Sequence, residues 1–225
     1  MELFFACFAV FAKEVRHLWR ARARVAATFA FAVATLLIFS FAGGLDGEVL
    51  RANAAGYFWA GLLLASTLCL SESFRVENEH GALEALLLLP VHPTAIFVGK
   101  AAGNAVVLMV VGVAVLPIAT ALFDLHFAEG IPAFLLTIFA GCLAIAAPGT
   151  VHAALASRAR SSDVLLPLLL FPLVVPCVIA SVQASRLALA GDAMNQYPSW
   201  LSVVAAFALV QWLLGAVLFA QVVED

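Results

Sequence analysis

Charged side chains are scarce in this sequence. Asp, Glu, Lys and Arg together make up 11% of its 225 residues, whereas a soluble globular domain usually contains about 25%. Hydrophobic residues reach 65%, and the mean hydropathy is +1.10. This composition excludes an ordinary soluble domain and indicates a chain that lies in a lipid bilayer.

Motifs for nucleotide and metal binding are also missing. The Gly99-Lys100 pair has Thr94 where a Walker A loop requires its first glycine, so the chain has no phosphate loop of that kind. The four cysteines are isolated, with no Cys-x-x-Cys spacing, and are predicted to be small buried side chains. No Ser-His-Asp arrangement or inward-facing carboxylate pair stands out, so we predict no catalytic residue and no enzyme activity.

The alternating polarity of membrane β-strands is absent too. Instead, six long segments contain no Asp, Glu, Lys or Arg: 25–45, 52–71, 101–123, 130–157, 164–185 and 193–223. Each reaches the roughly 20 residues that a helix needs to cross a bilayer. The sequence therefore predicts an all-α polytopic membrane protein, in which residues 1–225 form a single transmembrane domain of six helices.

The distribution of basic residues predicts the orientation of this domain. With the N-terminus inside, the outer loops hold only Arg51 and Arg186, and the inner segments hold the other nine basic residues. Because basic residues favour the cytoplasmic side, both termini are expected in the cytoplasm. Residues 1–22 have apolar side chains at helical spacing beside basic ones, which predicts an amphipathic helix in the inner interface. Its arginine cluster is expected to contact phospholipid and not nucleic acid.

The six apolar segments offer no ionisable group for binding or relaying protons or sodium ions. Coupling to an ion gradient is therefore disfavoured, and energy for transport must come from another polypeptide. The cytoplasmic segment 72–95 is the candidate for the part of the chain on which that polypeptide acts. After the acidic residues Glu77 and Glu79 and the flexible Gly81, it predicts a short helix over 82–89 that ends before Pro90.

That short helix has two different faces. Leu83, Leu86 and Leu87 share one face, while Glu84 points elsewhere. Between membrane spans, such an apolar face has nothing of its own chain to cover it, so we predict docking on a partner protein. The alternative is a helix that lies flat on the lipid headgroups.

Prolines mark the fourth and fifth spans. Pro148 and Gly149 predict a kink in the fourth, and the fifth carries Pro167, Pro172 and Pro176. Because prolines leave backbone carbonyls without partners, the fifth span is expected to be covered by protein or to line a cavity. An architectural kink and a hinge that gates transport both remain open for Pro148.

The five histidines are scattered over both sides of the membrane, without an i, i+4 pair. We predict no metal site from them. His126, in an outer loop beside Phe127, is the best placed of the five to contact haem iron.

Several of these stretches together resemble a known family. They are Glu79-His80-Gly81-Ala82-Leu83-Glu84 running to Pro90 and Gly99-Lys100, then Ala147-Pro148-Gly149, and the proline-rich fifth span after Arg160. In this combination the chain resembles, over almost its whole length, the haem exporter protein B family, the permease subunit of the cytochrome c maturation ABC transporter. The acidic piece alone is similar to the broader exporter-type permeases.

The resemblance implies a bacterial inner-membrane permease that binds no cofactor itself and pairs with a separate cytoplasmic ABC ATPase, which holds the ATP. The 82–89 helix would sit in a groove of that ATPase as a coupling helix. Leu83, Leu86 and Leu87 would fill the groove, while Glu77, Glu79 and Glu84 would pair with its basic residues.

Further partners implied by the resemblance are a second permease copy or a haem-handling membrane subunit, a small single-span subunit and a periplasmic haem chaperone. Haem is then the expected substrate, either passing through this chain or leaving with the loaded chaperone. The absence of cationic side chains from the span interiors favours the second route. A permease for lipid or drug, and a structural subunit with no transport cycle, are the alternatives.

Overall fold

The computed structural model describes residues 7, 9–13, 22–44, 46–79, 92–128, 130–157 and 162–224. Over these residues the chain is helical apart from short connections, and none of them forms a strand. The long helices are α2 (Arg22–Ala42), α3 (Gly47–Glu79), α5 (Pro93–Phe123), α6 (Ile131–Ser157), α7 (Ser162–Ala190) and α8 (Tyr197–Glu224). All 6 contain a stretch long and apolar enough to cross a membrane, which confirms the predicted all-α polytopic fold.

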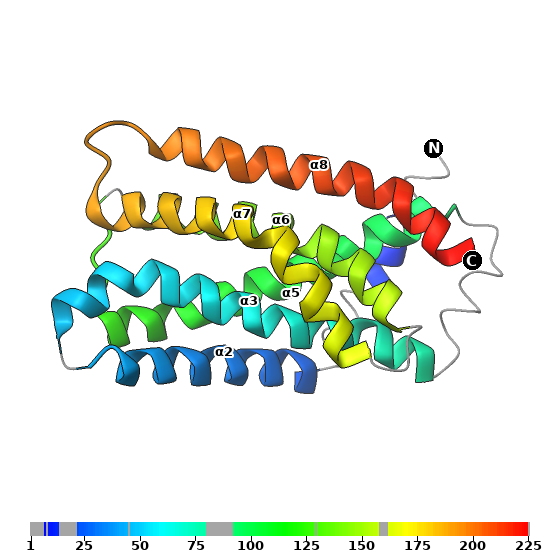
Figure 1. Ribbon diagram of the computed structural model, residues 1–225, viewed down its shortest axis with the longest axis horizontal. Coiled ribbons are helices and arrows are strands. Elements are labelled where there is room, and N and C mark those ends of the chain that lie inside the picture. The colour runs from blue at the N-terminus through cyan, green and yellow to red at the C-terminus, as the bar shows by residue number, and fades with distance from the viewer. Residues whose placement is uncertain are drawn as a thin grey trace.

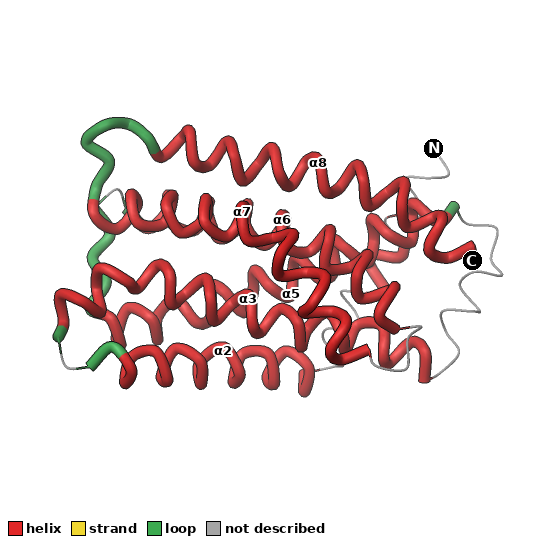
Figure 2. Tube along the Cα trace, in the orientation of Figure 1, coloured by secondary structure: helices red, strands yellow, loops and turns green. Residues whose placement is uncertain are grey.

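The helices form one elongated bundle (Figure 1). The α2–α3, α5–α6 and α7–α8 connections lie at one end of it, and both termini lie at the other (Figure 2). In this view α2 and α8 lie at opposite edges, with the remaining helices between them. Following the predicted orientation, we call the end with the termini the inner end and the opposite one the outer end.

Polar side chains in the outer connections set the starts of two helices. Asp46 accepts a hydrogen bond from the backbone N–H of Glu48 at 3.0 Å, just before α3. Asp192 accepts from the backbone N–H groups of Gln196 and Tyr197, both at 2.7 Å, at the start of α8. These carboxylates satisfy N–H groups that a helix leaves without partners, so they have a structural role.

The third span begins earlier than the sequence predicted, at Pro93 instead of residue 101. His92 caps it by accepting from the backbone N–H of Thr94 at 3.3 Å, and a proline is favoured at the first helical position. The sequence interpretation ended the span at a charged residue, yet the helix buries Lys100 to 1% exposure. The prediction that the spans contain no ionisable side chain is therefore wrong at Lys100.

The acidic stretch after the second span is helical as well. Residues 72–79 continue α3 to Glu79, beyond the apolar part of the helix, which ends at Phe74. Because a helix transmits displacement along its axis, this extension connects whatever binds near its end to the membrane-embedded part of α3.

Part of the predicted interfacial helix packs against the bundle. Val10 is 7% exposed, and a Cβ atom built on Gly99 of α5 would lie 2.5 Å from its Cγ1. The glycine therefore allows the N-terminal segment to approach the backbone of α5 closely. Most of the predicted 1–22 helix lies outside the described residues.

The outer half of the bundle packs around Trp59. Its ring is fully buried, and its indole N–H donates to Ser185 Oγ of α7 at 2.8 Å. The ring also lies against α6, where a Cβ atom on Gly141 would be 2.2 Å from Cη2 of Trp59. Close contact between α3 and α6 thus requires glycine at this position.

Replacing Gly141 by alanine is expected to lower the free energy of unfolding by about 1–3 kcal/mol, because a rigid buried ring cannot make room for the added methyl group. Gly56→Ala is the matched control, since a Cβ atom there meets nothing within 4 Å, and alanine favours a helix by roughly 0.5–1 kcal/mol. Thermal unfolding of the detergent-solubilised proteins measures the difference, and equal stability of the two variants would contradict this packing.

Candidate functional site

The predicted coupling segment, 72–95, connects the inner ends of α3 and α5. Glu77 and Glu79 belong to the last turns of α3. The other residues predicted to contact an ATPase lie outside the described residues: Gly81, Leu83, Glu84, Leu86, Leu87 and Pro90. Their docking role stays a prediction. The structure does describe the helix ends on which this segment would act.

Polar side chains that are buried, or partly buried in the case of Arg24, link those helix ends. We call five of them the inner polar cluster: Arg24 of α2, Cys69 of α3, Lys100 and Asn104 of α5, and Thr150 of α6. Arg24 Nη2 donates to Asn104 Oδ1 at 2.8 Å and lies 3.3 Å from the sulfur of Cys69. Asn104 Nδ2 in turn donates to Thr150 Oγ1 at 3.0 Å. These contacts join four helices.

Much of the cluster is shielded from water, so each of its hydrogen bonds contributes to the stability of the bundle. Asn104 and Thr150 have no exposed surface. The Nε atom of Arg24 is buried and has no hydrogen-bond partner in the part of the chain that the structure describes. A guanidinium that is partly shielded from water depends on the hydrogen bonds it retains, so Asn104 is the main support of the Arg24 charge among these contacts.

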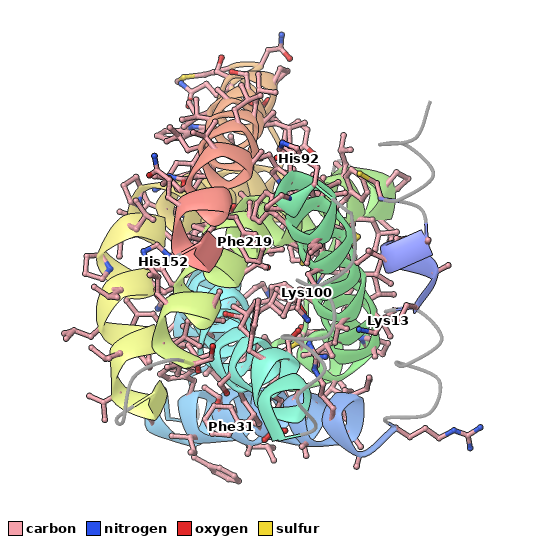
Figure 3. The ribbon with its side chains drawn as sticks, turned by 90° about the vertical axis from the view of Figure 1, so that its right-hand side faces the viewer. Lys13, Phe31, His92, Lys100, His152 and Phe219 are labelled. Atoms are coloured by element: carbon pink, nitrogen blue, oxygen red, sulfur yellow. The ribbon has the colours of Figure 1, made fainter. Side chains whose placement is uncertain are left out.

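Lys100 connects α3 to α5 closer to the inner end. Its Nζ donates to the backbone carbonyl of Ser73 at 3.4 Å and lies 4.5 Å from the centre of the Phe74 ring. The face of an aromatic ring stabilises an ammonium group that is shielded from water. Figure 3, which looks onto the inner end, shows Lys100 pointing toward the middle of the bundle. Because these α3 residues directly precede its acidic extension, Lys100 ties that extension to α5.

The predicted hinge at Pro148 and Gly149 adjoins the cluster. α6 remains one helix through this point. His152 Nδ1 donates to the carbonyl of Pro148 at 2.6 Å, which gives this histidine a structural role. A Cβ atom on Gly149 would lie 2.4 Å from Cδ1 of Leu70, so α3 packs directly against the backbone of α6 beside the proline.

α7 also remains helical through Pro167, Pro172 and Pro176. It bends within the half that carries these prolines (Figure 1). Pro172 and Pro176 are exposed on the surface of the bundle. Among the described residues, none of this chain covers Pro172 and Pro176. The expectation that this span is covered by protein or lines a cavity therefore stays a prediction, as does the hinge role of the three prolines.

A second polar site lies at the outer end. It is a pocket of about 370 Å³ lined by Glu48, Arg51, Ala52, Ala55, Leu125, His126, Arg186, Leu189 and Ala190. Arg51 forms an ion pair with Asp124, and His126 Nδ1 lies 3.0 Å from the carbonyl oxygen of Asp124. Arg186 donates to Gln183 Oε1 at 3.3 Å. The two outer arginines and His126 therefore share one pocket, although they come from three different parts of the chain.

Within the described ranges, His, Cys, Asp and Glu residues form no group of three or more that could hold a metal ion. Arg51 and Arg186 at the outer site can bind anions, and the contacts of the inner polar cluster can transmit helix movement. The sequence interpretation identified His126 but missed that Arg24, Lys100 and Asn104 link helices. These residues adjoin or lie inside apolar segments, and Lys100 entered only as part of the Gly99-Lys100 pair.

Comparisons with known proteins cover nearly the whole chain. The family model for CcmB protein matches residues 5–225. The chain is 32% identical over 205 residues to Heme exporter protein B of Pseudomonas aeruginosa, and the match covers 88% of each chain. It is 29% identical over 201 residues to Heme exporter protein B of Rhodobacter capsulatus, which covers 88% of this chain and 90% of that protein. The Bradyrhizobium diazoefficiens protein of the same name is 28% identical over 186 residues, or 82% of each chain.

Proposed function

Because the chain belongs to the CcmB protein family, we propose that it is the permease subunit of an ABC transporter complex that delivers haem for the biogenesis of c-type cytochromes. Its relatives carry the name Heme exporter protein B, and its 6 apolar helices make it a multi-pass membrane protein. The basic residues at the inner end support an orientation in a bacterial inner membrane with both termini in the cytoplasm.

Energy for this role comes from ATP bound on a partner. The chain has no Walker A loop, so a cytoplasmic ABC ATPase hydrolyses the nucleotide and moves the predicted 82–89 helix. α3 reaches Glu79 as a continuous helix, and α5 begins at Pro93. The two helices thus adjoin the coupling segment on both sides, and a displacement of that segment acts on both.

The inner polar cluster is the observation that carries this mechanism. Lys100 fixes the inner end of α3 to α5 through Ser73 and Phe74. Asn104 continues the connection to α2 and α6. A push on the coupling segment therefore moves these four inner helix ends together instead of bending one helix alone. The contact of Leu70 with Gly149 passes the movement to α6 beside Pro148.

At the outer end, the pocket beside His126 is the proposed point of contact with the haem-carrying partners. Arg51 and Arg186 suit carboxylates, and His126 suits iron or an anionic group. Haem is the substrate in this proposal, and the chain keeps no cofactor of its own. The partners are a second permease copy or a haem-handling membrane subunit, a small single-span subunit and a periplasmic haem chaperone.

Two routes for haem remain within this proposal. ATP-driven repacking either carries haem past this chain or frees the loaded chaperone from the complex. The sequence favoured release because it showed no cations within the spans. Lys100 is a buried cation at the inner end, and Arg24 is a partly buried one, so the absence of cations no longer favours release of the chaperone over passage of haem.

Affinity purification in mild detergent tests the proposal. We expect the tagged chain to bring down an ABC ATPase and at least one further membrane protein, with a haem absorption band in the purified complex. Co-purification of an ATPase without haem or a haem-binding chain would point to a lipid or drug permease. If substitutions in the coupling segment leave the hydrolysis rate of the ATPase unchanged, the chain is instead a structural subunit.

A further inference from the structure

Gln211 lies near the middle of α8, a helix with little protein around it. Only 17% of the residues in the apolar window of α8 are buried, against 56% for α3 and α6. The Gln211 side chain is partly exposed and makes no hydrogen bond within the part of the chain that the structure describes. An amide needs donors and acceptors, and hydrocarbon offers neither, so its position calls for a partner.

Helical spacing places Gln211 at the border between the packed and the exposed sides of α8. The packed side is formed by Val204, Ala208, Gly215 and Phe219. Leu214 and Leu218, three and seven residues after Gln211, are 48% and 44% exposed. Phe207, one turn before Gln211, packs against a cluster that contains Cys177 and Ala180 of α7. The border that carries Gln211 therefore faces α7.

α7 leaves α8 at the same depth. Ala180 is buried, but Pro176, one turn nearer the inner end on the same side of α7, is exposed. Figure 1 shows α7 running beside α8 through the outer half and bending away toward the inner end. Ala180 of α7 and Ala208 of α8 belong to the same cluster. Because the two helices are antiparallel, Pro176, one turn before Ala180, lies at about the level of Gln211, one turn after Ala208.

A second polar group at this depth, a backbone carbonyl of α7, lacks its usual helical hydrogen bond. Pro176 has no N–H group, so the carbonyl oxygen of Pro172 cannot receive the usual helical hydrogen bond. Pro172 is itself exposed. The α7–α8 flank, which we define by Pro172, Pro176, Gln211 and Leu214, thus combines an amide and a backbone carbonyl at mid-membrane depth. Lipid chains satisfy neither group.

We propose that a transmembrane helix of a different polypeptide packs on the α7–α8 flank and donates hydrogen bonds from a hydroxyl or amide side chain to Gln211 and the Pro172 carbonyl. The two oxygens of the flank can accept about four hydrogen bonds, whereas the Gln211 amide donates about two. A second copy of this chain would bring the same excess of acceptors. A helix with serine, threonine or asparagine at this depth supplies the missing donors. This inference does not depend on the substrate of the complex.

Photo-crosslinking in native membranes tests whether a helix of another polypeptide packs on the α7–α8 flank. A benzoylphenylalanine at Leu214 is expected to form an adduct with a different membrane polypeptide. Leu209 is the matched control, because it is 63% exposed on the opposite side of the same helix, and the probe there is expected to form no protein adduct. Gln211→Leu should lower the adduct yield about fivefold to thirtyfold, the change that one interhelical hydrogen bond carries in lipid, and Gln211→Asn should retain most of it.

Three results would overturn the proposal. One is an adduct between two copies of this chain. Another is equal adduct formation, or none, at Leu214 and Leu209. The third is an unchanged yield in Gln211→Leu. If Gln211→Leu fails to fold, the comparison of the two probe positions in the otherwise native chain still decides the question.

Discussion

Leu86→Asp is expected to abolish co-purification of this chain with its ATPase while leaving membrane insertion intact. The predicted face of the 82–89 helix places Leu83, Leu86 and Leu87 in an apolar groove of the partner. A carboxylate there must be buried without a partner, which costs about 3 kcal/mol or more. That loss lowers the affinity more than a hundredfold, so the complex should not survive purification. Immunoblotting of the ATPase in the tagged eluate measures the effect.

Ala85→Asp is the matched control for this prediction. It introduces the same charge two residues from Leu83, on the side of the predicted helix opposite Leu83, Leu86 and Leu87. We expect this variant to retain the ATPase. Loss of the ATPase from both variants would mean that the segment is merely intolerant of charge. Retention in both would rule out docking through the leucine face.

Asn104→Leu is expected to lower the free energy of unfolding by about 3 kcal/mol. The substitution removes the hydrogen bond that Arg24 donates at 2.8 Å and the one that Thr150 receives at 3.0 Å. Hydrogen bonds to charged groups contribute roughly 1.5–3 kcal/mol, and a buried group left without a partner adds to the cost. Unfolding of the purified protein, followed by intrinsic fluorescence in detergent, measures the change.

Two further variants separate this cause from a simple loss of volume. Asn53→Leu makes the same replacement at an exposed position of α3. Among the described residues, the Asn53 side chain donates only to the carbonyl of Val49, so this variant should change stability by less than about 1 kcal/mol. Arg24→Leu combined with Asn104→Leu should cost less than the sum of the single variants, because the unsupported charge is gone. Strict additivity would show that Arg24 does not depend on Asn104.

The membrane topology followed from the sequence because it depends on local properties. Transfer of a segment into lipid is close to a sum over its own residues, and the length of the apolar run sets whether a helix crosses the bilayer. The spans at 25–45 and 130–157, for example, correspond to α2 and α6 within a few residues. The main error fell at Lys100, where a charge was taken as the end of a span although its neighbours shield it.

The relations between helices were decided only in three dimensions. Arg24, Asn104 and Thr150 meet because three helices pack at one depth, and Arg51, His126 and Arg186 share a pocket through three separate connections. The exposure of Gln211 and Pro176 likewise depends on where α7 bends. Hydropathy determined that this chain forms six spans, and spacing predicts a segment between the second and third spans that docks on a partner. Packing determined which buried polar groups connect them, since a side chain's partners are set by neighbouring helices and not by its place in the sequence.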